Sequence, residues 1–408
     1  STLIGEASKI GKQFSAENSV LFCNSEGFHS EVCSIFAGPY TVTHHRSTLL
    51  IAGMFSFFNA GSGTNQSNHM YKLGPLHQGI IERGGKTGSS SYLLWPSRVG
   101  AFSAIMGKHY SNFDSSDFPF SYVNEDSGQS TLVPGMNFFT VGTMRDGLKW
   151  PTRDGRKNTD KLDQLNFEVL SPYTGQKMMQ GQSILLDLYA GAERGQEYVS
   201  HKGILIKRLL LKTCSRYYRM ALEKYLGDAL IARLTASPVT DINELVSQSD
   251  SADDGDSPWV DVSGLLCSQS RIEDLLNRIK TGEVLDLHTL QVELQKIHKS
   301  YTQDEWSWVV KAMPQVCGFE SINTENLLTV LEKWKVSTTK LLNMVEMDAS
   351  KEFEGNVRTG FGIDGYQDDD FDEVRGKFES NSFKKQLDDM RQAVESNYDH
   401  ALAILNNL

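Results

Sequence analysis

The chain has 408 residues, of which 39% are apolar and 22% charged, and its net charge is −11. This length predicts two or three domains of ordinary globular composition. The acidic balance disfavours wholesale binding to nucleic acid or an anionic membrane, and no apolar run approaches the roughly 20 residues of a membrane span.

The five cysteines are odd in number, widely spaced and without a C-x-x-C pair: Cys23, Cys33, Cys214, Cys267 and Cys317. This spacing argues against a disulfide framework and against a zinc knuckle. It predicts buried, reduced thiols in a cytoplasmic protein.

Short units of about six residues recur through the first part of the chain. Ile4-Gly5 and Ile10-Gly11 lie six apart, and similar units begin at Ile51, Ile105 and Val133. An aliphatic residue followed by a small one at this period is typical of a left-handed parallel β-helix, in which the aliphatic residue points inward. We predict this fold for residues 1–145, with inserted loops at 63–88 and 112–128.

Residues 146–236 are predicted to form a charged arm (146–163) followed by helices that pack on the β-helix. Ser171-Pro172 has the pattern of a capped helix start, and 207–234 has an amphipathic helical period. The acidic, serine-rich segment 237–258 predicts a flexible linker.

Residues 259–408 are predicted to be all-α. Ser270 is the expected cap of a helix that ends at Lys280, and helical periods follow over 286–316, 324–347 and 382–408. The fold class is therefore β + α.

Four of the ten histidines fall between residues 35 and 79, among glycines and short apolar triplets. Imidazole suits proton transfer near neutral pH, so the candidate catalytic residues are His45, His69, His44 and His77. Coils stacked in register would bring residues 43–46 beside 66–77, forming one pocket.

Polar residues near these histidines and in the charged arm are the candidate substrate-binding residues: Asn65, Ser67, Asn68, Lys72, Arg145, Lys149 and Arg153. Arginine and lysine suit the phosphate oxygens of a nucleotide-bearing ligand. A metal site between histidines competes with this interpretation, but nothing in the spacing fixes a tetrahedral geometry, and we expect no metal.

Long motifs carry a family resemblance: FAGPYTVTHHRSTLLIAGMFSF (36–57), NQSNHMYKLGPLHQG (65–79), SYLLWPSRVGAF (91–102), NFEVLSPYT (166–174), WVDVSGLL (259–266) and RTGFGIDG (358–365). By these the chain resembles a family of uncharacterised bacterial proteins with a hexapeptide-repeat β-helix followed by a helical region. In similar proteins more β-helix precedes the point where this chain begins. The resemblance, with the missing initiator Met, suggests an upstream fragment of the same gene product as a partner.

The fold that the resemblance implies is similar to that of sugar acyltransferases, by analogy only. The leading expectation is acyl transfer from acetyl-CoA or another acyl-CoA to a sugar or nucleotide-sugar, with a histidine as general base, in a homotrimer or dimer. The alternatives are a non-catalytic binding or assembly module, a β-helix protein related to sugar nucleotidyltransferases, and a metal-dependent β-helix enzyme.

Overall fold

The computed structural model describes residues 1–67, 77–236, 241–246, 255–362 and 365–408. The chain forms two compact units, each assembled from three stretches. The first unit comprises Ser1–Phe138, Asp146–Arg219 and Gln248–Lys311, and the second comprises Phe139–Arg145, Met220–Ser247 and Ala312–Leu408. The sequence had predicted domains that each consist of one continuous range of residues.

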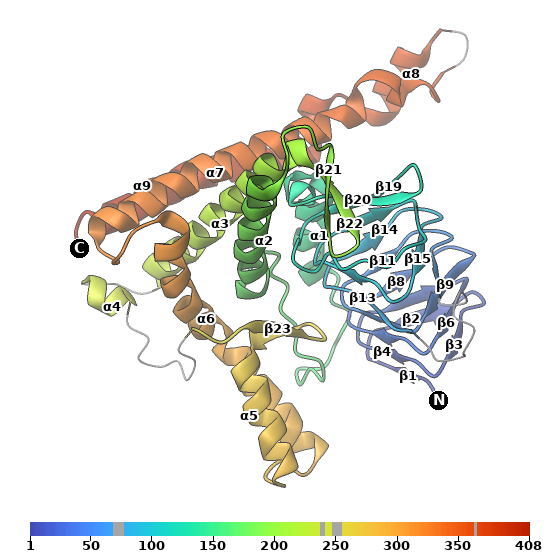
Figure 1. Ribbon diagram of the computed structural model, residues 1–408, viewed down its shortest axis with the longest axis horizontal. Helices are drawn as coiled ribbons and strands as arrows, with labels where there is room; N and C mark the ends of the chain where they lie inside the picture. The colour runs from blue at the N-terminus through green and yellow to red at the C-terminus, as the bar shows by residue number, and fades with distance from the viewer. Residues whose placement is uncertain (68–76, 237–240, 247–254, 363–364) are drawn as a thin grey trace. The chain divides into compact units, whose positions relative to one another are not determined.

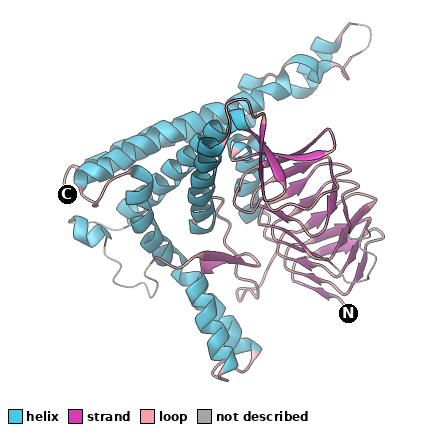
Figure 2. Ribbon diagram, viewed as in Figure 1, coloured by secondary structure: helices cyan, strands magenta, loops and turns pink. Residues whose placement is uncertain are grey.

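A three-sided solenoid of short parallel strands forms the N-terminal part of the first unit (Figures 1 and 2). The first face contains β1 (Leu3–Ile4), β4 (Val20–Leu21), β7 (Phe36–Ala37), β10 (Gly53–Phe55), β13 (Gly79–Ile81) and β16 (Arg98–Val99). The second face begins with β2 (Lys9–Gly11), β5 (Glu26–Phe28), β8 (Val42–Thr43), β11 (Asn59–Ala60), β14 (Lys86–Thr87) and β17 (Ala104–Met106). The third face contains β3 (Ser15–Glu17), β6 (Ser30–Cys33), β9 (Thr48–Ile51), β12 (Asn65–Ser67), β15 (Tyr92–Leu94) and β18 (Lys108–His109).

The strand register sets the length of each coil. Leu3 pairs with Val20, Val20 with Phe36 and Phe36 with Met54, so these coils take 16 to 18 residues, close to three hexapeptides. Alternate residues point inward, and the column is filled by buried aliphatic side chains such as Leu21, Leu50 and Ile81. The predicted parallel β-helix of the left-handed type is thereby confirmed.

Residues at the corners adopt left-handed backbone conformations even where they are not glycine. At one corner, φ lies between 51° and 75° in every coil, and the residues stack as a column: Ala7, Asn24, Tyr40, Phe57, Gly84, Phe102 and Phe120. We call this the aromatic corner. Stacked rings stabilise it, with centroids 5.2 Å apart for Tyr40 and Phe57 and 5.0 Å apart for Phe102 and Phe120. These contacts offset the unfavourable backbone conformation.

Two hairpins extend the second face. β17 pairs in parallel with β19 (Tyr122–Asp126), which turns into β20 (Gln129–Val133), and β21 (Tyr198–His201) and β22 (Ile204–Lys207) continue the sheet. The expected loop at 112–128 is wrong, because Ala104 pairs with Tyr122 at the ordinary coil spacing and only the tip of the hairpin projects. The expected loop at 63–88 falls largely on 68–76, outside the described residues.

Helices and one further hairpin complete the first unit. α2 (Pro172–Gly191) begins as predicted, with Ser171 accepting a hydrogen bond from the Thr174 backbone N–H in a capping box. α5 (Gln269–Lys280) and the first part of α6 (Leu287–Cys317) follow the antiparallel pair β23 (Trp259–Val262) and β24 (Leu265–Ser268). That pair corrects the all-α prediction for 259–408, and the N-cap of α5 is Ser268 rather than Ser270.

The predicted charged arm also contains regular structure, because α1 (Val141–Thr152) covers its beginning. The long helix expected at 207–234 is confirmed as α3 (Arg208–Ala236). Within the expected linker 237–258, residues 242–246 form α4 (Ile242–Val246), and 237–240 and 247–254 lie outside the described residues.

The second unit is built around α7 (Thr324–Ser350) and α9 (Ser382–Leu405), which pack on each other, with α8 (Gln367–Arg375) between them in sequence. The end of α3 also packs on α7. Gly227 allows the close approach, since a Cβ there would lie 2.2 Å from Trp334, and the Trp334 indole donates a 2.7 Å hydrogen bond to Asp228.

Gln66 introduces an unsatisfied amide into the solenoid interior. It points inward beside Leu93, is fully buried, and neither its Oε1 nor its Nε2 has a hydrogen-bond partner among the described residues. Such a group costs about 1–3 kcal/mol. We therefore expect Gln66→Leu to raise the free energy of unfolding by about 1–3 kcal/mol, measured by chemical denaturation. Asn65→Leu, in the same strand but pointing outward, is the control, and an equal gain there would contradict this reasoning.

His109 gives the solenoid a pH dependence. Its imidazole is buried, with Nδ1 2.8 Å from the Ser130 hydroxyl, and burial lowers its pKa because the charged form loses its hydration. Below about pH 6.5 the unfolded chain therefore binds this proton more readily than the folded chain does. We expect stability to fall as pH falls below 6.5, by at most about 1.4 kcal/mol per pH unit from this group.

A His109→Gln variant is expected to lose that part of the pH dependence of unfolding between pH 7 and 5. His45→Gln, at an exposed corner of the solenoid, should retain the slope of the parent protein. Equal slopes for the parent and for His109→Gln would overturn the assignment.

Candidate functional site

A ladder of outward-facing side chains runs along the second face of the solenoid. The register pairs Lys9 with Glu26, Glu26 with Val42, Val42 with Asn59 and Asn59 with Lys86. Parallel strands in register place these side chains one above another at the strand spacing. Residues far apart in sequence thus share one surface.

This ladder forms the floor of a groove of about 450 Å3. One wall is the aromatic corner, through Tyr40 and Phe57, and the other is the second half of α1 with the residues that follow it. All lining residues belong to the first unit. The volume is within the range of small-molecule sites.

His44 and Glu26 form a dyad at the edge of the groove. The Nε2 atom of His44 lies 2.5 Å from Oε2 of Glu26, and the imidazole packs against Phe28 with ring centroids 5.7 Å apart. If Nε2 donates this hydrogen bond, Nδ1 carries a lone pair and has no partner among the described residues. A carboxylate that orients an imidazole in this way is the arrangement a general base needs.

Glu26 is held in its ionised form. Burial raises its pKa, but hydrogen bonds from Lys9, at 2.8 Å, and from His44 outweigh this effect, so the pKa of Glu26 lies below its usual value. The carboxylate is therefore charged throughout the neutral range. Its contribution to stability is present above about pH 4.5 and is lost as pH falls through the lowered pKa.

Three aromatic rings line the groove, those of Tyr40 and Phe57 from the aromatic corner and that of Trp150 from α1. Trp150 of α1 packs against Phe57 at 4.6 Å and Phe102 at 5.9 Å between centroids. Phe57 and Phe102 flank Gly84 in the aromatic corner. A Cβ on Gly84 would lie 2.4 Å from the Phe102 ring. The Tyr40 hydroxyl donates a 2.9 Å hydrogen bond to the Trp150 carbonyl, which fixes α1 against the corner.

The groove carries a local excess of positive charge. It is lined by four cations and two carboxylates: Lys9, Lys86, Lys149, Arg153, Glu26 and Asp146. Lys86 and Asp146 form an ion pair. The side chain of Arg153 is exposed and makes no ion pair with any residue the structure describes. In a protein of net charge −11, this groove is suited to an anion.

The segment after α1 is anchored to the solenoid rather than free. Asn24 of the aromatic corner donates to Asp154 at 3.1 Å and accepts from the Gly155 backbone N–H at 2.9 Å. Asp154 also accepts three hydrogen bonds from Arg156, one from its backbone N–H and two from its guanidinium. The expected charged arm is thus an ordered wall of the groove.

The structure brings three of the residues predicted from sequence to this groove, namely His44, Lys149 and Arg153. His45 is exposed at the adjacent corner, and its ring lies 6.3 Å from that of His44. Arg145 is exposed on α1 and belongs to the second unit.

The other predicted residues lie elsewhere. Asn65 and Ser67 are in β12 on the third face, and His77 precedes β13. Asn68, His69 and Lys72 are outside the described residues. The expected pairing of 43–46 with 66–77 is not the register found, since Thr43 pairs with Ala60 and Asn65 pairs with Leu49.

Sequence reasoning missed Glu26, Lys9 and the aromatic wall. The available signal was the 16 to 18 residue spacing that aligns Lys9, Glu26 and Val42, which a strict hexapeptide count obscures after Phe22. Within the described part of the chain, no three histidine, cysteine or acidic side chains are grouped closely enough to hold a metal ion.

Comparison with known proteins finds a family model that matches each part of the chain. Residues 1–189 match the family model of a domain of unknown function (DUF4954), and residues 240–403 match a second domain of unknown function (DUF6819). The expected resemblance to uncharacterised β-helix proteins is thereby confirmed.

An uncharacterized protein of Treponema pallidum (strain Nichols) is 26% identical to this chain over 306 residues, which cover 67% of the chain and 41% of that protein. The chain thus matches less than half of its relative's length. Among the described residues, no helix combines the length and the apolar character needed to cross a bilayer.

Proposed function

We propose that the protein is a β-helix transferase that moves an acyl group from an acyl-CoA to a hydroxyl or amino group of a sugar phosphate or nucleotide-sugar. The observation that carries this proposal is the His44–Glu26 dyad at the edge of a cationic, aromatic groove. The groove combines a proton acceptor with groups suited to a phosphate and to a flat ring.

In this proposal, Nδ1 of His44 takes the proton from the acceptor hydroxyl or amine as that atom attacks the thioester carbonyl. The carbon–sulfur bond breaks, and the CoA thiolate leaves and takes up a proton. Glu26 keeps the imidazole oriented and stabilises it when it becomes positively charged. Lys86, Lys149 and Arg153 supply the positive potential for the phosphate groups of the ligand.

The test uses the whole chain with acetyl-CoA and a panel of sugar phosphates, amino-sugar phosphates and nucleotide-sugars. Free thiol release and the mass of the acylated product are measured together. We expect turnover of at least one phosphate-bearing acceptor and none of its unphosphorylated form. Binding of a nucleotide-sugar without turnover would instead support a non-catalytic binding module, and the absence of both would overturn the proposal for this groove.

A further inference from the structure

A second cavity lies on the first face of the solenoid, away from the His44 groove. Its volume is about 520 Å3, and its lining comes from three parts of the fold that all belong to the first unit. The solenoid contributes the outward ladder Met54, Ile80 and Arg98, while α2 and β23 form the remaining walls.

A buried carboxylate at the wall of this cavity organises two cations. The Glu82 side chain is 3% exposed, and its Oε1 accepts hydrogen bonds from Arg98 Nε at 3.0 Å and Nη2 at 2.8 Å. Lys177 of α2 lies 2.9 Å from Oε2, and the Tyr173 hydroxyl donates to the same oxygen at 3.0 Å. Both carboxylate oxygens are therefore saturated with donors.

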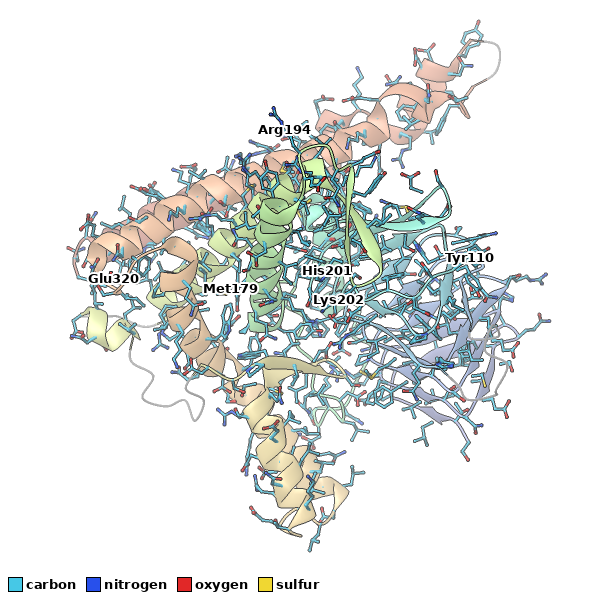
Figure 3. All side chains as sticks on the ribbon, viewed as in Figure 1. Tyr110, Met179, Arg194, His201, Lys202 and Glu320 are labelled. Atoms are coloured by element: carbon cyan, nitrogen blue, oxygen red, sulfur yellow. The ribbon has the colours of Figure 1, made fainter. Side chains whose placement is uncertain are left out.

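The cluster of Glu82, Arg98 and Lys177 contains two cations and one carboxylate. Among the lining residues, Glu82 is the partner of two cations, which leaves one positive charge at this cluster, and the Asp114 carboxylate outside the lining also acts on Arg98. The other charged residues of the lining have partners: Asp117 pairs with Lys202 at 2.6 Å and with His201 at 2.9 Å, and Asp261 lies 3.8 Å from Arg83. His201 and Lys202 lie on the β21–β22 hairpin (Figure 3).

The cavity combines a charged, partly exposed guanidinium with apolar side chains. The Arg98 side chain is 46% exposed, so part of its donor edge is open, and Gln180 adds an exposed amide one turn beyond Lys177. Met54, Ile80 and Trp259 add apolar surface to the lining. A partly buried positive charge beside apolar walls favours an anionic head attached to an apolar body.

We infer that this cavity binds a small organic anion with an apolar body, whose carboxylate or phosphate pairs with Arg98 and Lys177. The site is separate from the groove of the proposed transferase. Binding of an anion in this cavity does not depend on whether the protein catalyses acyl transfer. A His44→Ala variant should therefore bind such an anion as the parent protein does.

The experiment titrates the full chain with hexanoate, hexyl phosphate, hexanol and hexylammonium, followed by ligand-observed NMR. We expect the two anions to bind, and their relative affinities identify the head group that fits. Hexanol and hexylammonium should bind at least about tenfold more weakly, since they lack the charge-assisted hydrogen bonds.

Two substitutions should change affinity in opposite directions. Arg98→Gln removes the open cation and is expected to weaken anion binding by about tenfold. Glu82→Gln removes the internal counter-charge of the two cations and is expected to strengthen it by a similar factor. Arg194→Gln, an exposed arginine near the end of α2, is the matched control and should change nothing (Figure 3).

The inference is wrong if hexanol binds as tightly as hexanoate, if no anion binds, or if Arg98→Gln binds hexanoate as the parent does. Circular dichroism establishes that each variant is folded. If Glu82→Gln fails to fold, the half-exposed Arg98 still decides the outcome. If Arg98→Gln also fails, Lys177→Gln is measured against the same criterion.

Discussion

Replacing His44 by Ala is expected to reduce acyl transfer by about 10²–10⁴-fold, the usual contribution of a positioned general base. The loss should appear in kcat, because the groove that holds the ligand is lined mainly by other residues. Initial rates of thiol release at saturating acceptor measure this directly. The phosphate-bearing acceptor should still bind to the variant with little change in affinity.

His45 provides the matched control. It is the neighbouring histidine at the same corner, but it is exposed and forms no hydrogen bond or ion pair with Glu26, which pairs with His44 instead. We expect His45→Ala to retain the parent rate. Glu26→Gln keeps a hydrogen-bond acceptor for the imidazole and loses the charge, so its rate should fall between those of the parent and His44→Ala. A His45→Ala variant as inactive as His44→Ala would contradict the assignment of the dyad.

The architecture of the solenoid could be predicted from the sequence because it depends on patterns within a few neighbouring residues. The alternation of an aliphatic residue with a small one at a period of six dictates inward side chains and tight corners, and Ile4-Gly5 and Ile10-Gly11 carry it. The helices were predicted for the same reason, since the Ser171-Pro172 cap and the helical period over 207–234 depend on residues that are close together in sequence.

The register between coils could not be predicted in the same way. It depends on the length of every coil, and coils of 16, 17 and 18 residues follow one another without a marker in the sequence. A shift of one or two residues changes which side chains become neighbours. For this reason His44 was identified as a candidate while its partner Glu26, 18 residues earlier, was not.

The corners show a further limit of the sequence. Left-handed backbone favours glycine, yet Tyr40, Phe57 and Phe102 adopt it at the aromatic corner. Their stacking on the rings of neighbouring coils stabilises that conformation, and such stacking is a tertiary effect. The wall of the groove therefore arises from contacts that no single coil reveals.

Arg83→Met is expected to destabilise the first unit by about 3–5 kcal/mol, the usual cost of removing one member of a buried ion pair. The Arg83 side chain is fully buried, and its guanidinium stacks on the Phe57 ring at 4.1 Å. It donates to the Asn166 carbonyl, and Nη1 lies 3.5 Å from the Gly264 carbonyl and 3.8 Å from Asp261. The substitution leaves these acceptors and the buried carboxylate without a cation.

The β23–β24 hairpin should respond first, because Asp261 and Gly264 belong to it and Arg83 ties it to the solenoid. Hydrogen exchange of the hairpin amides and the thermal midpoint measure the effect. The double variant Arg83→Met, Asp261→Asn removes the unpaired charge and keeps an oxygen for the Gly264 N–H, which now donates to Asp261 at 2.6 Å. It should recover part of the lost stability, and no recovery would mean that packing against Phe57, rather than charge pairing, is the main contribution of Arg83.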